Sequence, residues 1–198
     1  MRILLAEDQS MVRGALAALL GMEPGFEIIQ AADGDEAMEL LRTQQFDVFL
    51  TDIEMPGRTG LDLAQWLQAR NSEIKTIVIT TFGRAGYIRR AIDLGVAGFL
   101  LKEAPSEELI GAIYKIMSGK RVIDGELALT ALGESDPLND KERRALRMAS
   151  EGKSTAAIAQ NLCLTEGTVR NYLSEAIAKL NAANRVDAAR IARQKGWL

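Results

Sequence analysis

The chain has 198 residues, 47% of them hydrophobic, and a net charge of −3. This length suits one large globular domain or two small ones, and no apolar run approaches the length of a membrane span. The chain contains no histidine, which excludes histidine-based catalysis and histidine-ligated metals. Because the first residues enter a strand pattern rather than a signal peptide, we expect a cytoplasmic protein.

Residues 1–118 alternate strand-like and helix-like patterns five times. Short apolar runs bounded by Gly, Pro or polar clusters are typical of strands that are buried on both faces. Such runs lie near 2–6, 26–30, 46–51, 75–80 and 97–101. The alternation predicts an α/β domain with a doubly wound, parallel sheet of five strands.

Apolar residues at helical spacing predict the first and fifth helices of this domain over 10–21 and 106–118. Methionine fills irregular gaps between packed elements, so we expect Met11, Met38 and Met117 to be packing residues. The domain then ends near Gly119.

The remainder of the chain has a different organisation. Residues 119–137 are poorly periodic and are interpreted as a linker. From residue 138 the pattern is wholly helical, with helices predicted over 140–151, 154–162, 166–180 and 185–195. Two helices joined by a short turn, the second with exposed polar residues at its start, are typical of a helix-turn-helix domain. Basic residues outnumber acidic ones in this part, which favours nucleic acid as its partner.

Two smaller expectations concern this helical part. Cys163, the single cysteine, cannot form an internal disulfide, and its apolar helical surroundings predict that it packs in the core. The last helix carries a face of small and apolar residues that suits pairing with a second copy of the chain. These residues are Val186, Ala189, Ile191 and Ala192.

Polar residues follow four of the predicted strands at the point where each strand ends. Glu7 and Asp8 follow the first run, Asp52 the third, Thr80 the fourth and Lys102 the fifth. In an open parallel sheet, ligands bind at the carboxyl ends of the strands. Neighbouring carboxylates repel one another unless a hard cation such as Mg²⁺ lies among them, and a lysine and a hydroxyl beside that cation suit a phosphoryl group. The pattern therefore predicts a place where an aspartate is phosphorylated.

Short motifs along the whole chain resemble those of one family. The first 118 residues contain Ala6-Glu7-Asp8, Asp52-Ile-Glu-Met-Pro-Gly57 with Gly60, Ile79-Thr80-Thr81 and Leu101-Lys102. The tail contains Leu138-Asn-Asp-Lys-Glu-Arg143, Gly152-Lys-Ser154, Ile158-Ala159, Leu162, Thr168-Val-Arg-Asn-Tyr172, Lys179-Leu180 and Asn184-Arg185. In this order they resemble two-component response regulators of the NarL/FixJ family, in which a flavodoxin-like (CheY-like) receiver precedes a LuxR-type helix-turn-helix. Asp-Ile-Glu-Met-Pro-Gly, Thr-Thr-Phe and the terminal Lys-Gly-Trp are similar to regulators of membrane-lipid desaturation.

The resemblance implies a phosphoacceptor and a metal site. Asp52 is implied to be the carboxylate nucleophile that forms an acyl phosphate. Asp8 and Asp52 are implied to ligate Mg²⁺, with the backbone carbonyl of Glu54 as a third ligand and Glu7 bound through water. Mg²⁺ keeps several waters, so a sparse set of protein ligands is sufficient.

The resemblance also implies a switch around the phosphoryl group. Lys102 would pair with one phosphoryl oxygen, and Thr80 would donate a hydrogen bond to another. Phe99 would be the aromatic side chain that moves inward as Thr80 vacates space. Phe82, two residues after Thr80, cannot orient a hydrolytic water, so we expect slow loss of the phosphoryl group.

In the tail, the recognition helix is expected to start near Glu166 and to present polar residues to DNA. Arginine can read guanine and asparagine can read adenine, whereas small hydroxyls and lysine more often contact phosphate. The positions expected to contact DNA are Lys153, Ser154, Thr165, Thr168, Arg170, Asn171 and Ser174. A two-fold dimer predicts an inverted-repeat site in promoter DNA.

These features predict a DNA-binding transcription regulator rather than an enzyme, switched when a sensor histidine kinase phosphorylates Asp52 and the protein dimerises. One alternative is a dimeric regulator that does not depend on phosphorylation, which the complete set of Asp8, Asp52, Thr80 and Lys102 disfavours. Another is a phosphotransfer hydrolase with Asp52 as nucleophile and Glu54 as the second acid. No insertion that would build a substrate pocket is visible in so compact a domain.

Overall fold

The computed structural model describes residues 1–81, 83–123, 128–129 and 136–198. The chain divides into two compact units, an N-terminal α/β unit and a C-terminal helical unit. Within the described residues, no helix combines the length and apolar character needed to cross a membrane.

The N-terminal unit contains a parallel sheet with strand order β2-β1-β3-β4-β5-β6. Its strands are β1 (Arg2–Ala6), β2 (Glu27–Ala31), β3 (Val48–Thr51), β4 (Lys75–Thr80), β5 (Gly98–Leu101) and β6 (Val122–Ile123). The predicted fold class is confirmed, and the five predicted strands are all present. The sixth strand is additional and lies inside the stretch interpreted as a linker, where two residues are too few to produce a periodic pattern.

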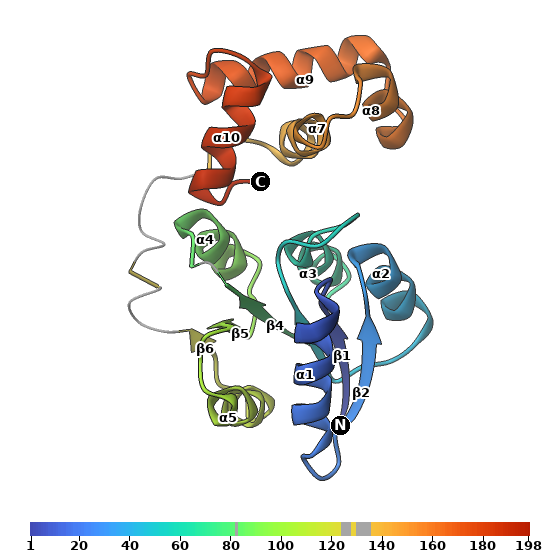
Figure 1. Cartoon of the computed structure of the whole chain (residues 1–198), viewed down its shortest axis with the longest axis vertical. Helices are drawn as coiled ribbons and strands as arrows, with labels where there is room; N and C mark the ends of the chain where they lie inside the picture. The colour runs from blue at the N-terminus through green and yellow to red at the C-terminus, as the bar shows by residue number, and fades with distance from the viewer. Residues whose placement is uncertain (82, 124–127, 130–135) are drawn as a thin grey trace. The chain divides into compact units, whose positions relative to one another are not determined.

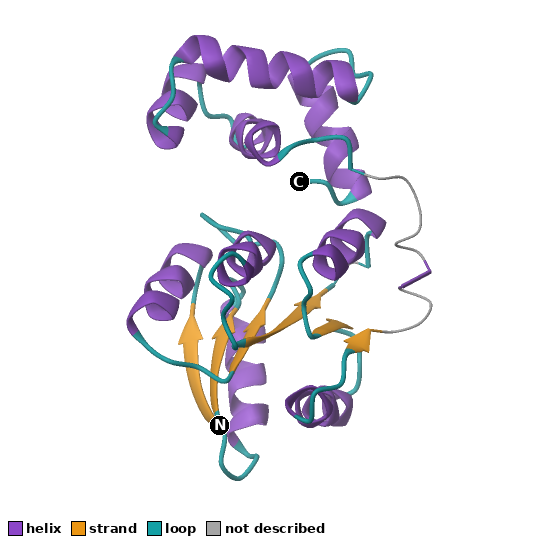
Figure 2. Cartoon of the chain, turned by 180° about the vertical axis from the view of Figure 1, so that it is seen from behind, coloured by secondary structure: helices purple, strands orange, loops and turns teal. Residues whose placement is uncertain are grey.

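Five helices pack around this sheet, namely α1 (Ser10–Gly21), α2 (Gly34–Thr43), α3 (Gly60–Gln68), α4 (Ala85–Asp93) and α5 (Ser106–Met117). Alternate residues along each strand point to opposite faces, so the unit has two apolar layers. Leu5, Leu50 and Ile79 pack against α1 and α5, whereas Leu4 and Phe49 pack against α2 and α3. Figures 1 and 2 show these helices on the two faces of the sheet.

Two of the methionines expected to be packing residues are on the surface. Met38 is buried in the layer under α2, as predicted. Met11, in α1, is 88% exposed, and Met117, at the end of α5, is 41% exposed, so the prediction was wrong for both. Each lies on the side of its helix that faces away from the sheet. The chemistry of a methionine side chain does not indicate on which side of a helix the residue lies, so it could not predict this exposure.

The C-terminal unit is a bundle of four helices around one apolar core. They are α7 (Asp140–Ser150), α8 (Thr155–Leu162), α9 (Glu166–Lys179) and α10 (Arg185–Lys195). Each begins at a polar N-cap whose side chain accepts backbone N–H groups of the first turn. These caps are Asn139, Ser154, Thr165 and Asn184. The predicted helix-turn-helix arrangement of α8 and α9 is therefore present.

Two expectations in this unit were wrong. Cys163 is exposed and has a φ of 53°, because it is the residue that ends α8 and turns the chain toward α9. Ala189 and Ala192 are buried in the core of their own unit and are not available for pairing with a second copy. Of the apolar face predicted on α10, Val186 remains exposed, at 73%.

Candidate functional site

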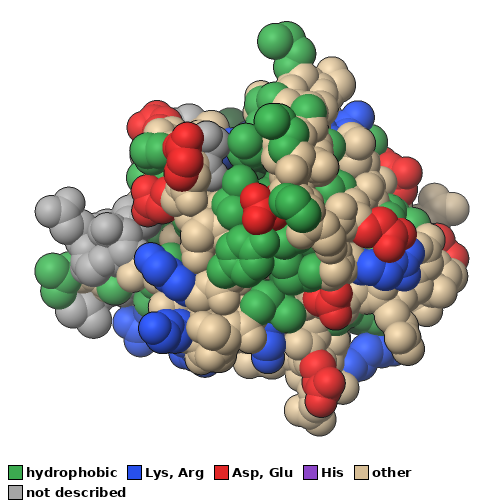
Figure 3. All heavy atoms as spheres, turned by 90° about the horizontal axis from the view of Figure 1, so that it is seen from below, with side chains coloured by type: hydrophobic (Ala, Val, Ile, Leu, Met, Phe, Trp, Pro, Cys, Tyr) green, Lys and Arg blue, Asp and Glu red, His purple; other side chains and the backbone are tan. Residues whose placement is uncertain are grey.

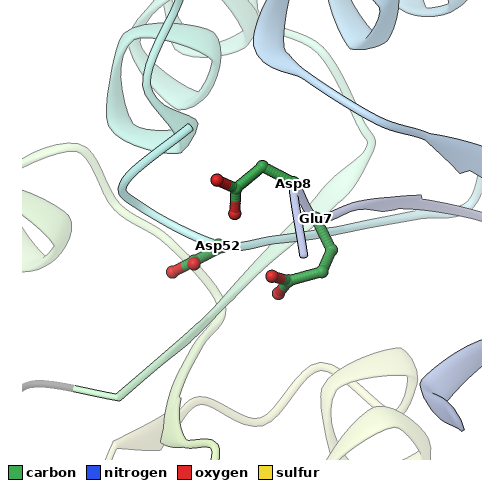
Figure 4. Close-up of side chains that lie close together, drawn as sticks. All are labelled: Glu7, Asp8 and Asp52. Carbon is green, nitrogen blue, oxygen red and sulfur yellow. The ribbon is translucent and has the colours of Figure 1, made fainter. Parts of the chain in front are cut away.

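The polar residues singled out from the sequence gather at one edge of the sheet. Glu7 and Asp8 follow β1, Asp52 follows β3, Thr80 ends β4 and Lys102 follows β5. Because these strands are parallel, their carboxyl ends lie together. Carboxylate oxygens of Glu7, Asp8 and Asp52 lie within 4.8 Å of one another, and Figure 4 shows the three side chains converging from the ends of β1 and β3. The structure thus brings Glu7, Asp8, Asp52 and Lys102 together, and Thr80 ends a strand at the same edge of the sheet.

Lys102 bridges two of the carboxylates. Its Nζ lies 2.6 Å from Glu7 Oε2 and 2.7 Å from Asp52 Oδ2, and the side chains of all three residues are at least nine-tenths buried. Burial raises the pKa of the Asp52 and Glu7 carboxyls, while their hydrogen bonds to Lys102 lower it in part. Burial lowers the pKa of Lys102, but its hydrogen bonds to both carboxylates outweigh that effect, so its pKa is higher than usual. The site therefore holds more negative charge than its one lysine balances.

The donor set fits Mg²⁺. It offers only oxygen ligands, and Asp8 is exposed, which leaves room for the waters that Mg²⁺ retains. A divalent cation would also remove the electrostatic cost of placing Asp8 beside two buried carboxylates. The side chain of Glu54 is exposed and is not part of this cluster, and metal binding by its backbone carbonyl stays a prediction.

The loop that carries Asp52 is fixed at both ends. Asp52 Oδ1 accepts a hydrogen bond from the backbone N–H of Ile53 at 2.6 Å. At the start of α3, Thr59 and Asp62 form a reciprocal capping box. Gly60 lies against the end of β3, since a Cβ at Gly60 would clash with the carbonyl oxygen of Asp52. A side chain at this position would therefore displace the backbone of Asp52.

Replacing Gly60 with alanine is expected to destabilise the N-terminal unit by about 2 kcal/mol, because the contact is with backbone that cannot rotate away. Gly14→Ala is the matched control, since nothing lies within 4 Å of a Cβ at this exposed site in α1. That control should stabilise by roughly 0.5 kcal/mol through helix propensity. Urea unfolding measures both, and equal stability of the two variants would contradict the close approach of Gly60 to Asp52.

The two residues predicted to act as a switch are buried. Thr80 is 2% exposed, and Phe99, in the middle of β5, is 1% exposed. In the sheet register Phe99 pairs with Val78 on one side and with Ile123 of β6 on the other. Phe82 lies outside the described residues.

In the C-terminal unit, α9 separates a polar face from an apolar one. Arg170, Asn171 and Ser174 are exposed, whereas Val169 and Leu173 are buried in the core. Arg170 Nη1 lies 3.4 Å from Glu166 Oε2, one turn earlier on the same helix. The side chains predicted to read bases are thus accessible, and Glu166 is an acidic neighbour of Arg170.

The residues predicted to contact phosphate lie at helix starts. The hydroxyl of Ser154 accepts a hydrogen bond from Ala157 N, and the hydroxyl of Thr165 accepts one from Thr168 N, both at 3.2 Å. Lys153 Nζ lies 3.2 Å from Glu151 Oε2. Helix N-termini suit phosphate because unpaired N–H groups point outward there. The two hydroxyls have a capping role that the sequence analysis did not assign to them.

Comparison with known proteins identifies a family for each of the two units. Residues 3–114 match the family model of the response regulator receiver domain, and residues 136–192 match that of the luxR family of bacterial regulatory proteins. The chain is 44% identical over 196 residues to the transcriptional regulatory protein DesR of Bacillus subtilis, covering 98% of both chains. The chain belongs to the NarL/FixJ family of response regulators.

Other relatives of this response regulator agree. It is 45% identical over 198 residues to the uncharacterized transcriptional regulatory protein YvfU of Bacillus subtilis, covering 100% of this chain and 99% of that one. Its fold matches the solved structure of the response regulator ChrA from a heme-sensing two-component system, with 28% identity, a TM-score of 0.55 and coverage of 100% and 98%. The relatives are transcription regulators and not enzymes, so the response regulator is a DNA-binding transcription regulator of a two-component system.

Proposed function

We propose that phosphorylation of Asp52 switches this response regulator between a monomer and a dimer that binds promoter DNA. The observation that carries the proposal is the cluster of Glu7, Asp8 and Asp52 beside Lys102 at the carboxyl edge of the sheet. It combines a nucleophilic carboxylate with the ligands for a divalent cation and a lysine for a phosphoryl oxygen. The alternative of a receiver that only dimerises leaves this charged cluster without a purpose.

In the proposed reaction, a carboxylate oxygen of Asp52 attacks the phosphorus of a phosphohistidine on the sensor kinase. The new O–P bond forms as the N–P bond breaks, and the released imidazole nitrogen takes up a proton from solvent. Mg²⁺, when bound by Asp8 and Asp52, neutralises charge on the phosphoryl oxygens. The negative charge added by phosphorylation attracts the Thr80 hydroxyl. Phe99 then moves inward into the space that Thr80 vacates.

The outer surface of α1 supports dimerisation. Its only charged residue is Arg13, and the exposed positions Met11, Ala15, Ala18 and Met22 follow one another at helical spacing. Nearby, α5 exposes the large side chains of two further residues, Tyr114 (47%) and Met117 (41%). Hydrophobic side chains also gather at the centre of the face in Figure 3, at the end of the molecule where α1 finishes. An apolar surface of this kind is typical of a protein interface.

The experiment that tests the proposal is light scattering after size-exclusion chromatography, with Mg²⁺ and with or without beryllofluoride, which stands in for the phosphoryl group. We expect the 21.6 kDa chain to double its mass only with beryllofluoride. Ala15→Glu should remain a monomer, because it places a charge in the interface while keeping a good helix former. Ala69→Glu, exposed at the end of α3, should dimerise like the wild type. Unchanged mass in the wild type would contradict the proposed switch.

Promoter binding through α9 leads to a second expectation. Arg170→Ala and Asn171→Ala should each weaken binding to a selected target duplex about tenfold and leave binding to random DNA nearly unchanged, because both are proposed to contact bases. Lys153→Ala should weaken both equally and reduce the salt dependence by about one counterion. Fluorescence anisotropy at several salt concentrations measures these effects. A uniform loss in all three variants would contradict base reading by α9.

The partners follow from this assignment. A sensor histidine kinase donates the phosphoryl group and, if Phe82 slows spontaneous hydrolysis, also removes it. A phosphorylated dimer with two α9 helices suits an inverted repeat in promoter DNA. The protein would act in the cytoplasm, where both partners are accessible.

A further inference from the structure

Arg13 is the one charged residue of α1, and its side chain does not extend into solvent. It is half-buried and turns back toward the loop that joins β1 to α1. Its Nη1 donates a hydrogen bond to the backbone carbonyl of Glu7 at 2.6 Å and lies 3.4 Å from the carbonyl of Asp8. These are the two residues whose carboxylates form the cluster with Asp52.

At the start of α1, the side-chain capping contacts that usually fix such a loop are missing among the described residues. Gln9, the N-cap of α1, makes no side-chain capping hydrogen bond, and the first turn of α1 has no acidic residue. The backbone N–H of Gln9 donates to Glu7 Oε1 at 3.2 Å, so the orientation of the Glu7 carboxylate depends on where the loop lies. Asp8 is exposed, so burial among other side chains does not fix its orientation. The position of both carboxylates therefore depends on the backbone that Arg13 holds.

We propose that Arg13 is a positioning residue for the divalent cation, which fixes the Glu7–Asp8 backbone so that both carboxylates face Asp52. The inference rests on the proposed function, since it concerns the same site. Groups that orient metal ligands without touching the metal strongly affect its affinity, and their loss weakens binding about 10- to 100-fold. Arg13 acts through the loop and touches neither the cation nor the phosphoryl group.

The sign of the effect separates positioning from electrostatics. A guanidinium beside an acidic cluster repels a cation, so its removal by Coulomb's law alone can only strengthen cation binding. If Arg13 instead positions the ligands, its removal weakens cation binding although a positive charge has been lost. A contribution of Arg13 to stability alone would leave the affinity of the folded protein unchanged.

The experiment measures binding of Mn²⁺, used in place of Mg²⁺, to the full chain by electron paramagnetic resonance. Arg13→Met keeps the length and apolar stem of the side chain and removes its donors, and should weaken binding about tenfold. Arg13→Lys keeps a charged donor and should stay within about threefold of the wild type. Arg42→Met, which removes an exposed arginine in the last turn of α2, is the matched control and should bind like the wild type. Circular dichroism confirms that each variant is folded.

The outcomes are distinct. Mn²⁺ binding by Arg13→Met that equals or exceeds that of the wild type would overturn the role of Arg13 while leaving the proposed function intact. A loss of the same size in Arg42→Met would also overturn it, because the effect would then not be specific to the loop that Arg13 holds. Absence of Mn²⁺ binding in the wild type would instead contradict the metal site on which the proposed function depends.

Discussion

Replacing Asp52 with asparagine is expected to reduce phosphoryl transfer from a small donor such as acetyl phosphate to background, a loss of roughly a thousandfold or more. The amide is not nucleophilic, and no other carboxylate can take its place. Glu7 has no exposed surface, whereas Asp52 is 6% exposed, and Asp8 is proposed to be a ligand of the cation. Incorporation of radioactive phosphate into intact protein measures the effect.

Asp8→Asn is the matched variant for this experiment, since it also removes one carboxylate from the cluster. It removes a proposed metal ligand and keeps the nucleophile, so its phosphorylation should fall and recover in part as Mg²⁺ is raised. Asp52→Asn should not recover at any Mg²⁺ concentration. Labelling of Asp52→Asn at the rate of the wild type would place the phosphoacceptor elsewhere. Release of many equivalents of phosphate by the wild type would favour the hydrolase alternative.

Replacing Lys102 with methionine is expected to destabilise the receiver by about 3 kcal/mol at neutral pH. The lysine side chain is 9% exposed, and its Nζ contacts two carboxylates that are at least as buried. Removing one partner of such an arrangement leaves the desolvation cost of the others uncompensated. Mg²⁺ should restore part of the lost stability, because a cation in the cluster would replace the missing charge.

The size of this loss should depend on pH. Burial raises the pKa of the Glu7 and Asp52 carboxyls above the unfolded value, and the lowering effect of Lys102 disappears in the variant. A carboxyl whose pKa is higher in the folded state contributes stability that is complete below its unfolded pKa and is lost as pH rises through the folded pKa. The difference between variant and wild type should therefore shrink as pH is lowered from about 7.5 to about 5.

Urea unfolding followed by the fluorescence of Trp66, in a Trp197→Phe background, reports on the receiver alone, because the chain has two tryptophans and Trp197 belongs to the other unit. Lys75→Met, at the exposed start of β4, is a control for loss of a lysine and should change stability little. A loss for Lys102→Met that is equally large at both pH values would contradict an electrostatic origin of the loss.

Much of the site could be predicted from the sequence, for a physical reason. In a parallel sheet the residue after each strand is bound to lie at the carboxyl edge, so Asp52, Thr80 and Lys102 could be brought together from strand positions alone. The same reasoning could not find Arg13, because its contact is with backbone carbonyls five and six residues earlier and leaves no pattern of residue types. Gly60 appeared as a motif residue, but its approach to the Asp52 carbonyl depends on where α3 starts in space.

Local sequence patterns were enough to predict the first five strands and the helices between them, the two units and the strand ends at which polar residues gather. These properties depend on local periodicity and on strand direction, which a single chain encodes residue by residue. The tertiary structure decided which helix faces are covered. It placed Met11 and Met117 on the surface, Ala189 and Ala192 in a core and Val122–Ile123 in the sheet, because burial depends on neighbours that are distant in sequence.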